Sequence, residues 1–273
     1  MTSGFVQGNG IGIHYRIAGV ESAPPLVLIN GVGDDLDGWV NQVDDFVAAG
    51  LRVVSYDNRG VGRSGQPPGP YTSGEMAADL KALVTGLGLP RFHLAGVSMG
   101  GAIAQEYAVA HPGDLISLVL ANTFAVADPF TAAAFQTWAT VAESAGMPVM
   151  MEQQAPWIFS PGFYRQYPER VAELIEAAQG STQPTAAFAA QMAALTGHDC
   201  TGRIGAVTVP TLVLAAADDI IIRPEESRRL FDALSPGVGT WAVVPGGHAA
   251  FWEDPGPWNR AVIDFVRRHG TSA

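Results

Sequence analysis

The chain has 273 residues, with 26 acidic residues against 15 lysines and arginines, so its net charge is −11 at pH 7. So acidic a surface repels nucleic-acid phosphates and anionic lipids, and binding to either is not expected. No apolar run reaches the ~20 residues of a membrane span, and the first residues do not resemble a signal peptide. The single cysteine excludes an intramolecular disulfide. We therefore expect a cytoplasmic enzyme or binding protein.

The first segments of the chain predict a β-hairpin. The dipeptide Asn9-Gly10 separates two strand-like segments, residues 5–6 and 11–17, and the second of these alternates apolar and polar residues. Asn-Gly between two such segments is typical of a tight hairpin turn. The sheet is therefore expected to begin with antiparallel strands.

Six apolar runs follow, and each ends at turn residues. They are residues 26–29, 52–56, 92–95, 115–121, 211–214 and 240–244. Continuous runs of Val, Leu and Ile are typical of strands that are covered on both faces. Segments with helical spacing lie between them at 72–87, 98–110, 224–234 and 257–268. The pattern predicts an α/β fold with a mostly parallel sheet and helices on both faces.

The stretch from residue 124 to residue 203 interrupts this alternation. It contains helical segments separated by Gly-Met-Pro at 146–148, Ser-Pro-Gly at 160–162 and Gln-Pro at 183–184. Insertions at one end of an α/β scaffold commonly carry function. We expect a core domain of residues 1–123 and 204–273, and a helical cap, or lid, of residues 124–203.

Residues 96–100 read Gly-Val-Ser-Met-Gly and match the pattern G-x-S-x-G. They follow a predicted buried strand and open an alanine-rich helix, which is the strand–turn–helix setting that this motif requires. The glycines leave room for a sharp turn in which the serine adopts a strained backbone conformation. The pattern predicts Ser98 as a nucleophile. Cys200 is a weaker candidate, because no comparable turn accompanies it.

A serine hydroxyl needs a base to act as a nucleophile. Of the six histidines, His248 is the one in a loop after a predicted strand, at the sheet edge where Ser98 is expected. Asp218 and Asp219 follow the run 211–214 at the same edge, and either can orient the base. The order Ser, Asp, His is that of the α/β-hydrolase fold.

Five landmarks in the chain resemble the α/β-hydrolases and together span nearly its whole length. They are residues 30–33, 57–64 and 96–100, Asp219 five residues before Pro224, and Gly247-His248. The resemblance implies an eight-stranded sheet with the cap inserted after the sixth strand. It also selects Asp219 as the acid and leaves Asp218 as the alternative. We interpret residues 57–64 as a structural turn in which Asp57 pairs with Arg59.

The resemblance also implies an oxyanion hole formed by the backbone N–H groups of Val32 and Met99. It implies no metal and no organic cofactor. Residues expected to line the substrate pocket are Asn30, Trp39, Trp138 and Trp157. Two of these expectations have alternatives: Asn30 can tie down its loop, and Trp39 can be packed between elements.

Among the α/β-hydrolases, the chain is most similar to bacterial 3-oxoadipate enol-lactonases and cofactor-free haloperoxidase-like esterases. The predicted cap has more carboxylates than arginines, which are Arg165, Arg170 and Arg203, and is rich in aromatic and Met residues. A buried dicarboxylate would need basic partners. We therefore expect a small, neutral, fairly hydrophobic ester or lactone, which would be cleaved through an acyl-enzyme.

Other functions are compatible with the same residues. The triad also suits carbon–carbon bond hydrolysis, a lyase reaction or perhydrolysis, and a small-molecule receptor with slow turnover is the alternative from another class. The expected partner is a small-molecule substrate, and the sequence leaves homo-oligomer formation open.

Overall fold

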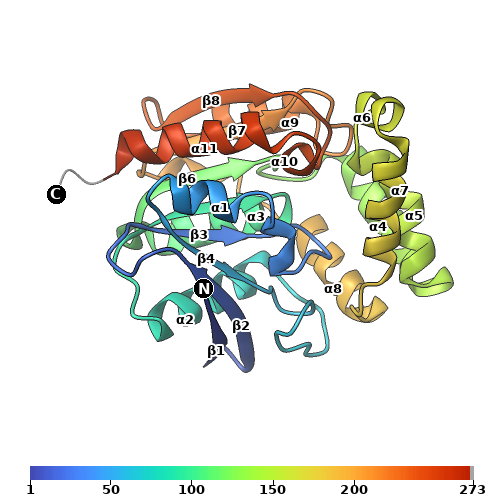
Figure 1. Ribbon diagram of the computed structural model, residues 1–273, viewed down its shortest axis with the longest axis horizontal. Coiled ribbons are helices and arrows are strands. Elements are labelled where there is room, and N and C mark those ends of the chain that lie inside the picture. The colour runs from blue at the N-terminus through green and yellow to red at the C-terminus, as the bar shows by residue number, and fades with distance from the viewer. Residues whose placement is uncertain (271–273) are drawn as a thin grey trace.

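The computed structural model describes residues 1–270 and is built around an eight-stranded sheet (Figure 1). The strands are β1 (Thr2–Gly8), β2 (Ile11–Ala18), β3 (Pro25–Ile29), β4 (Arg52–Tyr56), β5 (Phe92–Val97), β6 (Leu115–Ala121), β7 (Thr211–Ala216) and β8 (Gly239–Val244). Their order across the sheet is β1-β2-β4-β3-β5-β6-β7-β8. All six apolar runs of the sequence therefore form strands, as predicted.

The sheet begins antiparallel and continues parallel. β1 pairs with β2 through the hairpin at Asn9-Gly10, where both residues have positive φ, 48° and 82°. β2 pairs antiparallel with β4, and every later pairing is parallel. The parallel strands therefore share one carboxyl edge, at which the loops that follow them meet.

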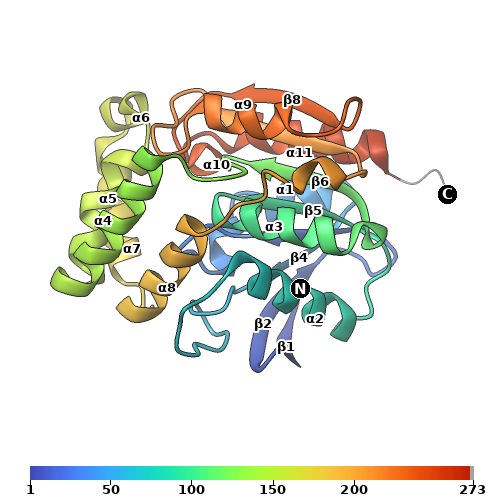
Figure 2. The ribbon, with the colours of Figure 1, turned by 180° about the vertical axis from the view of Figure 1, so that it is seen from behind.

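Helices cover both faces of this sheet. α2 (Ser73–Gly86), α3 (Met99–Ala110) and α9 (Pro224–Asp232) lie on the face that Figure 2 shows, and α1 (Val43–Ala48), α10 (Ala250–Glu253) and α11 (Pro255–His269) lie on the opposite face. The Thr72 hydroxyl caps α2 by accepting a hydrogen bond from the Glu75 N–H at 3.0 Å. Thr72 is therefore the N-cap of this helix.

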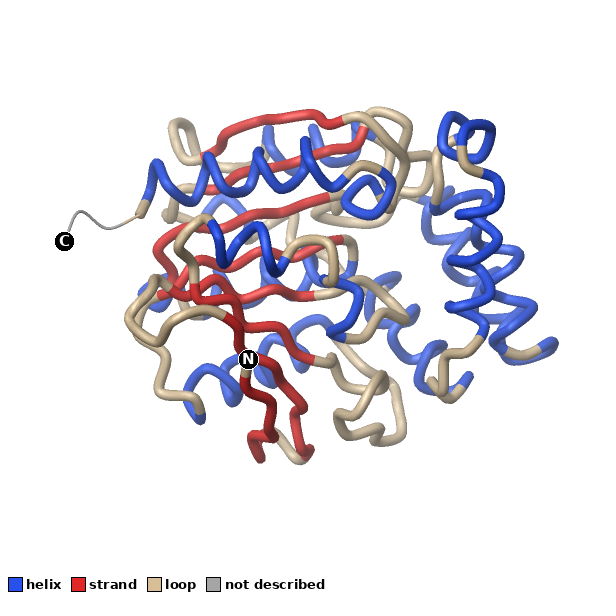
Figure 3. Tube along the Cα trace, viewed as in Figure 1, coloured by secondary structure: helices blue, strands red, loops and turns tan. Residues whose placement is uncertain are grey.

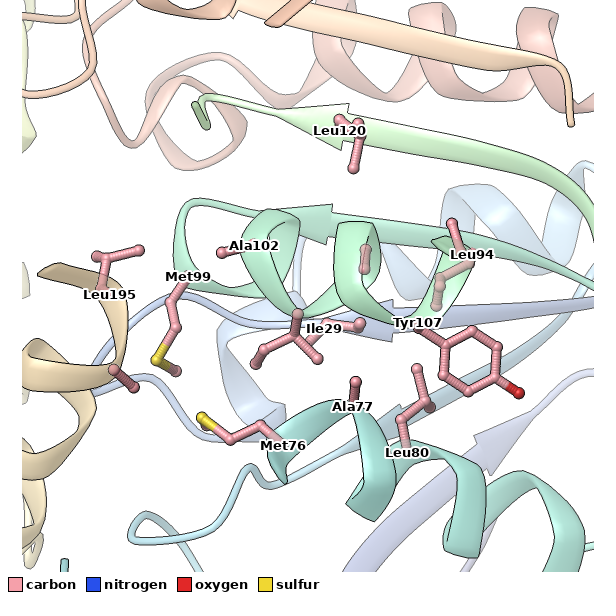
Figure 4. Packing of buried hydrophobic residues seen from close by; sticks show 14 of the residues in the cluster. Ile29, Met76, Ala77, Leu80, Leu94, Met99, Ala102, Tyr107, Leu120 and Leu195 are labelled. Atoms are coloured by element: carbon pink, nitrogen blue, oxygen red, sulfur yellow. The ribbon is translucent and has the colours of Figure 1, made fainter. Parts of the chain in front are cut away.

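Two apolar cores lie between the sheet and its helices, one on each face of the sheet. In β3, Val27 and Ile29 belong to one core, whereas Leu26 and Leu28 belong to the other. Ile29 lies in the first core with Met76 of α2, and with Met99 and Tyr107 of α3 (Figure 4). Full burial of such a side chain stabilises a fold by about 1.5–3 kcal/mol, so these runs anchor the centre of the sheet.

Five helices form the long insertion between β6 and β7. They are α4 (Pro129–Ala145), α5 (Met147–Ile158), α6 (Pro161–Gln166), α7 (Pro168–Gln179) and α8 (Thr185–Thr196). Figures 1 and 3 show α4 to α7 gathered on one side, beyond the carboxyl ends of the parallel strands. The two ends of the insertion meet, since Val126 bridges to Asp199 and Cys200 N–H donates to Ala125 O at 2.8 Å.

The fold class predicted from the sequence is confirmed, with the helical insertion after the sixth strand. The division into a core domain and a cap domain at residues 124 and 203 stays a prediction. No helix within residues 1–270 has the length and apolar character that crossing a membrane requires.

The turn at residues 57–64 is structural in an unexpected way, because Asp57 does not pair with Arg59. The Asp57 carboxylate accepts hydrogen bonds from Leu36 N, Arg63 N and His14 Nδ1 at 2.8, 2.8 and 2.7 Å. Arg59 points to α2, where Nε and Nη2 donate to Asp79 at 2.6 and 2.7 Å. The donors around Asp57 already satisfy its carboxylate, so Arg59 is left to join the turn to α2.

The central strand contains a histidine that should make the fold sensitive to acid. His93 is 1% exposed, and its Nδ1 lies 2.8 Å from Ser117 Oγ on β6. Burial, and to a smaller extent the charge of His269, lowers the pKa of His93 to about 4. In the unfolded chain this pKa is about 6.5, so between these values the unfolded chain binds more protons than the folded chain.

We therefore predict that His93 lowers the free energy of unfolding as pH falls from about 6.5 to 4, by up to about 3 kcal/mol. Denaturant unfolding measured across this pH range should show a smaller loss for His93→Gln than for the parent protein. Equal slopes for the parent and His93→Gln would contradict the prediction.

Candidate active site

Ser98 occupies a strained turn between β5 and α3. Its backbone angles are φ 56° and ψ −119°, a conformation that L-residues rarely adopt. A Cβ on Gly96 would lie 2.1 Å from Gly100 O, and one on Gly100 would lie 2.2 Å from Ile29 O. Because neither position has room for a side chain, the two glycines allow the first turn of α3 to pack directly on the strands.

Two neighbouring strands bring a histidine and an aspartate together. Asp219 follows β7 and His248 follows β8, which pairs with β7. Nδ1 of His248 lies 2.7 Å from Oδ2 of Asp219. Asp218 is exposed, and none of the side-chain hydrogen bonds within residues 1–270 involves its carboxylate. Of the two aspartates considered from the sequence, the structure brings Asp219 to His248.

The Asp219 carboxylate is held by four hydrogen-bond donors. Besides the imidazole of His248, it accepts bonds from the N–H groups of Ile221 and Ile222, each at 2.9 Å, and from Asn122 Nδ2, also at 2.9 Å. It is 2% exposed. A carboxylate with this many donors is fixed in orientation, so it fixes the orientation of the His248 ring in turn.

Sequence reasoning missed Asn122. This residue directly follows β6 and has φ 46°, which places its amide over Asp219. The available signal was its position, since a polar residue at the carboxyl end of a parallel strand lies at the edge where Ser98, Asp219 and His248 meet.

Ser98 and His248 line the same cavity, whose volume is about 510 Å³. The loop after β3 forms another part of its wall, and this part includes Val32. Within residues 1–270, neither Val32 N–H nor Met99 N–H donates a backbone hydrogen bond. Met99 N–H lies at the amino terminus of α3, where free N–H groups and the helix dipole favour negative charge. These two N–H groups are therefore available to an anionic oxygen.

The insertion supplies much of the apolar wall. Its contributions include Phe135, Trp138, Met151, Ile158, Met192 and Leu195. The part of the wall formed by the loop after β3 is acidic, because it contains Asp34, Asp35 and Asp37, whereas Arg170 is the basic residue that the insertion contributes. The cavity lining thus combines apolar side chains of the insertion with an acidic wall from this loop.

Trp138 lines the cavity as expected, whereas three other expected residues do not. Trp39 is fully buried, with ring centroids 5.4 Å from Phe251 and 5.8 Å from Trp258, which matches the packed alternative. Trp157 packs edge-on against Trp138. Local packing is the cause for Trp39, which packs against Phe251 and Trp258, whereas Trp138 lines the cavity although it also packs against aromatic rings.

Asn30 also lies outside the cavity wall. It is fully buried, its side-chain amide donates to Asp35 O, and its backbone carbonyl oxygen accepts a bond from Asn58 Nδ2 at 3.2 Å. Asn30 therefore ties down the loop, which was the alternative weighed from the sequence.

The insertion also holds two loops of the site directly. Gln191 of α8 accepts a hydrogen bond from Gly33 N–H at 3.1 Å, next to Val32. Glu253 of α10 accepts bonds from Gly247 N–H at 3.1 Å and from the Ser160 N–H and hydroxyl at 2.6 and 2.7 Å. Sequence reasoning missed both side chains. They join the loops beside Ser98 and His248 to the insertion.

Residues 24–255 match the profile of a family described as alpha/beta hydrolase fold. A protein of Variovorax paradoxus named carbamate hydrolase RutD is 30% identical over 94% of this chain and 96% of its own length. The 3-oxoadipate enol-lactonase 2 of Acinetobacter baylyi is 29% identical over 94% of both chains. The crystal structure of an enol-lactonase from Burkholderia xenovorans superimposes with a TM-score of 0.89, at 27% identity over 97% of this chain and 100% of that chain.

The glycine packing behind Ser98 predicts a stability effect with a matched control. Gly100→Ala places a Cβ 2.2 Å from Ile29 O and should lower the free energy of unfolding by about 1–3 kcal/mol or more. Gly74→Ala is the control, because Gly74 also lies in the first turn of a helix but has open space around it. It should be neutral or slightly stabilising. Denaturant unfolding measures both, and equal stabilities for the two variants would contradict the prediction.

Proposed function

The chain belongs to the α/β-hydrolase family and is a hydrolase, and from this premise we propose that it cleaves a small, fairly hydrophobic carboxylic ester or lactone. In this proposal Ser98 is the nucleophile, His248 is the general base and Asp219 orients His248. The single observation that carries the proposal is the shared cavity that Ser98 and His248 line, with His248 bonded to Asp219 at 2.7 Å.

The first half of the reaction forms an acyl-enzyme. Ser98 Oγ attacks the carbonyl carbon while Nε2 of His248 accepts the hydroxyl proton. Asp219 already occupies Nδ1, which leaves Nε2 as the nitrogen that can accept it. The carbonyl oxygen becomes an oxyanion and accepts hydrogen bonds from the N–H groups of Val32 and Met99. Collapse of this intermediate breaks the ester bond, and the alcohol leaves with the proton from His248.

The second half regenerates the enzyme. Water attacks the acyl carbon while His248 accepts one of its protons, and the same two N–H groups hold the second oxyanion. The acid then leaves, and His248 returns the proton to Ser98 Oγ. The fixed carboxylate of Asp219 stabilises the imidazolium at both stages, because it faces the proton on Nδ1.

The cavity wall supports an apolar, uncharged substrate. The side chains from the insertion are mostly apolar, and burial of apolar substrate surface contributes about 25 cal/mol per Å². Three aspartates face the cavity against one arginine, Arg170. Asp37 pairs with Arg16 and burial raises the pKa of Asp34 to about 7, so the full charge of three carboxylates is not present. A carboxylate on the substrate would nevertheless find no basic partner on this loop and would lose its hydration there. The same features support a cap role for residues 124–203, since this segment supplies much of the apolar lining and a cap of this kind would exclude water from the reacting groups.

The role of Ser98 is tested by steady-state hydrolysis of a short-chain p-nitrophenyl ester. Ser98→Ala should lower kcat by about 10⁴–10⁶, as is typical when such a nucleophile is removed. The variant should keep the parental unfolding midpoint. Retention of more than about a tenth of parental kcat would refute the assignment. A single stoichiometric burst by the parent protein would instead support a receptor with slow turnover.

The preference for an uncharged substrate is tested with two esters of the same alcohol, a butanoate and the corresponding succinate half-ester. We predict a kcat/KM at least about tenfold higher for the butanoate, because the carboxylate of the other ester meets the acidic wall. Arg165→Ala is the control for Arg170→Ala, since Arg165 belongs to the insertion but does not line the cavity. A preference for the succinate ester that Arg170→Ala abolishes and Arg165→Ala preserves would overturn the prediction.

A further inference from the structure

The acidic wall contains one carboxylate whose hydrogen-bonding capacity is unused. Asp34 lines the cavity two residues after Val32 and is half-buried. The neighbouring acids have partners: Asp35 Oδ1 accepts from Asp37 N at 2.9 Å, and Asp37 pairs with Arg16. Within residues 1–270, no donor lies within hydrogen-bond distance of the Asp34 carboxylate. Partial burial of a carboxylate is costly unless something donates to it.

Asp34 and Ser98 face the same small space. The position that a Cβ on Gly31 would occupy lies 3.7 Å from Asp34 Oδ2 and 3.9 Å from Ser98 Oγ. Gly31 carries no side chain, so this position is left to whatever is attached to Ser98. This position therefore lies within 4 Å of both oxygens and is not filled by a protein side chain.

The catalytic steps described above make no use of Asp34. Asp219 already serves His248, and the oxyanion needs N–H donors, which a carboxylate does not supply. Burial raises the pKa of Asp34 to about 7, the negative charge of Asp35 adds to this shift, and the positive charge of protonated His248 opposes it. This shift is what the absence of a donor would produce, and a donor supplied by the substrate would favour the ionised carboxylate.

We propose that Asp34 determines specificity by accepting a hydrogen bond from a donor on the carbon next to the scissile carbonyl. The preferred substrates would then be esters of α-hydroxy or α-amino acids. This inference rests on the proposed function, because it places the acyl group on Ser98. In an acyl group on Ser98, the heteroatom of an α-substituent is two bonds away from the carbonyl carbon. Rotation about the bond between the carbonyl carbon and the α-carbon can therefore bring this donor toward the Asp34 carboxylate, to a hydrogen-bond distance of about 2.7–3.0 Å.

The test compares phenyl esters of 2-hydroxypropanoic, 2-aminopropanoic, 2-methoxypropanoic and propanoic acids. Each kcat/KM is divided by the rate of the hydroxide-catalysed reaction, which corrects for intrinsic reactivity. In the parent protein, the hydroxy or amino ester should exceed the methoxy and propanoic esters by about 10- to 100-fold. A larger gain for the amino ester would identify a charged donor, and a larger gain for the hydroxy ester would identify a neutral donor.

Three variants locate the effect. The ratio to follow is the corrected kcat/KM of the hydroxy or amino ester divided by that of the propanoic ester. In Asp34→Ala this ratio should fall to within about threefold of one. In Asp34→Asn, which keeps an acceptor oxygen without the charge, the ratio should be intermediate. Asp44→Ala is the control, because this exposed aspartate of α1 does not line the cavity, and it should keep the parental ratio. Unfolding midpoints show whether each variant is folded.

Two failures are distinguishable. If the parent protein hydrolyses all four esters equally, or if Asp34→Ala keeps the preference, the role of Asp34 is refuted while the proposed function stands. If none of the esters is turned over in a Ser98-dependent way, the proposed function itself fails.

Discussion

The close packing of backbone on backbone behind Ser98 is the constraint on which the rest of the site depends. α3 begins so near β3 and β5 that side chains at Gly96 and Gly100 would overlap main-chain atoms. This contact holds Ser98 in its strained conformation at the end of the central strand. It also leaves Met99 N–H, at the amino terminus of α3, without a backbone acceptor among residues 1–270. One steric condition thus exposes a hydroxyl and directs a hydrogen-bond donor to the same place.

Parallel strand order brings the remaining groups to this point. The loops after β3, β6, β7 and β8 all begin at the carboxyl edge of the sheet, so residues more than a hundred positions apart become neighbours. The insertion then fixes two of these loops, through Gln191 at Gly33 and through the contact of Ser160 with Glu253. Because the same segment supplies the apolar wall, a change in its position would alter both the shape of the cavity and the loops beside Ser98.

The sequence was informative wherever short-range chemistry determines structure. The hairpin at Asn9-Gly10, the strand runs and the serine turn each depend on neighbouring residues, and the structure contains all of them. The choice of Asp219 over Asp218 as the acid came from the family resemblance and stays a prediction, and in the structure Asp219 is the aspartate that contacts His248. Long-range partners were not predictable: Asn122 meets Asp219 across 97 positions, and Arg59 reaches Asp79 instead of Asp57. Trp39 could not be placed because an aromatic residue suits a cavity wall and a packed core equally well.

The central claim is that the hydroxyl held in this strained turn forms the covalent intermediate. Its most direct test is rapid quenching of the protein during hydrolysis of a slowly deacylating ester, followed by peptide mass measurement. The account predicts that the mass of the acyl group appears on the peptide containing Ser98 and forms and decays at rates that match turnover. An acyl group on another residue, or full turnover without any acylated peptide, would contradict it.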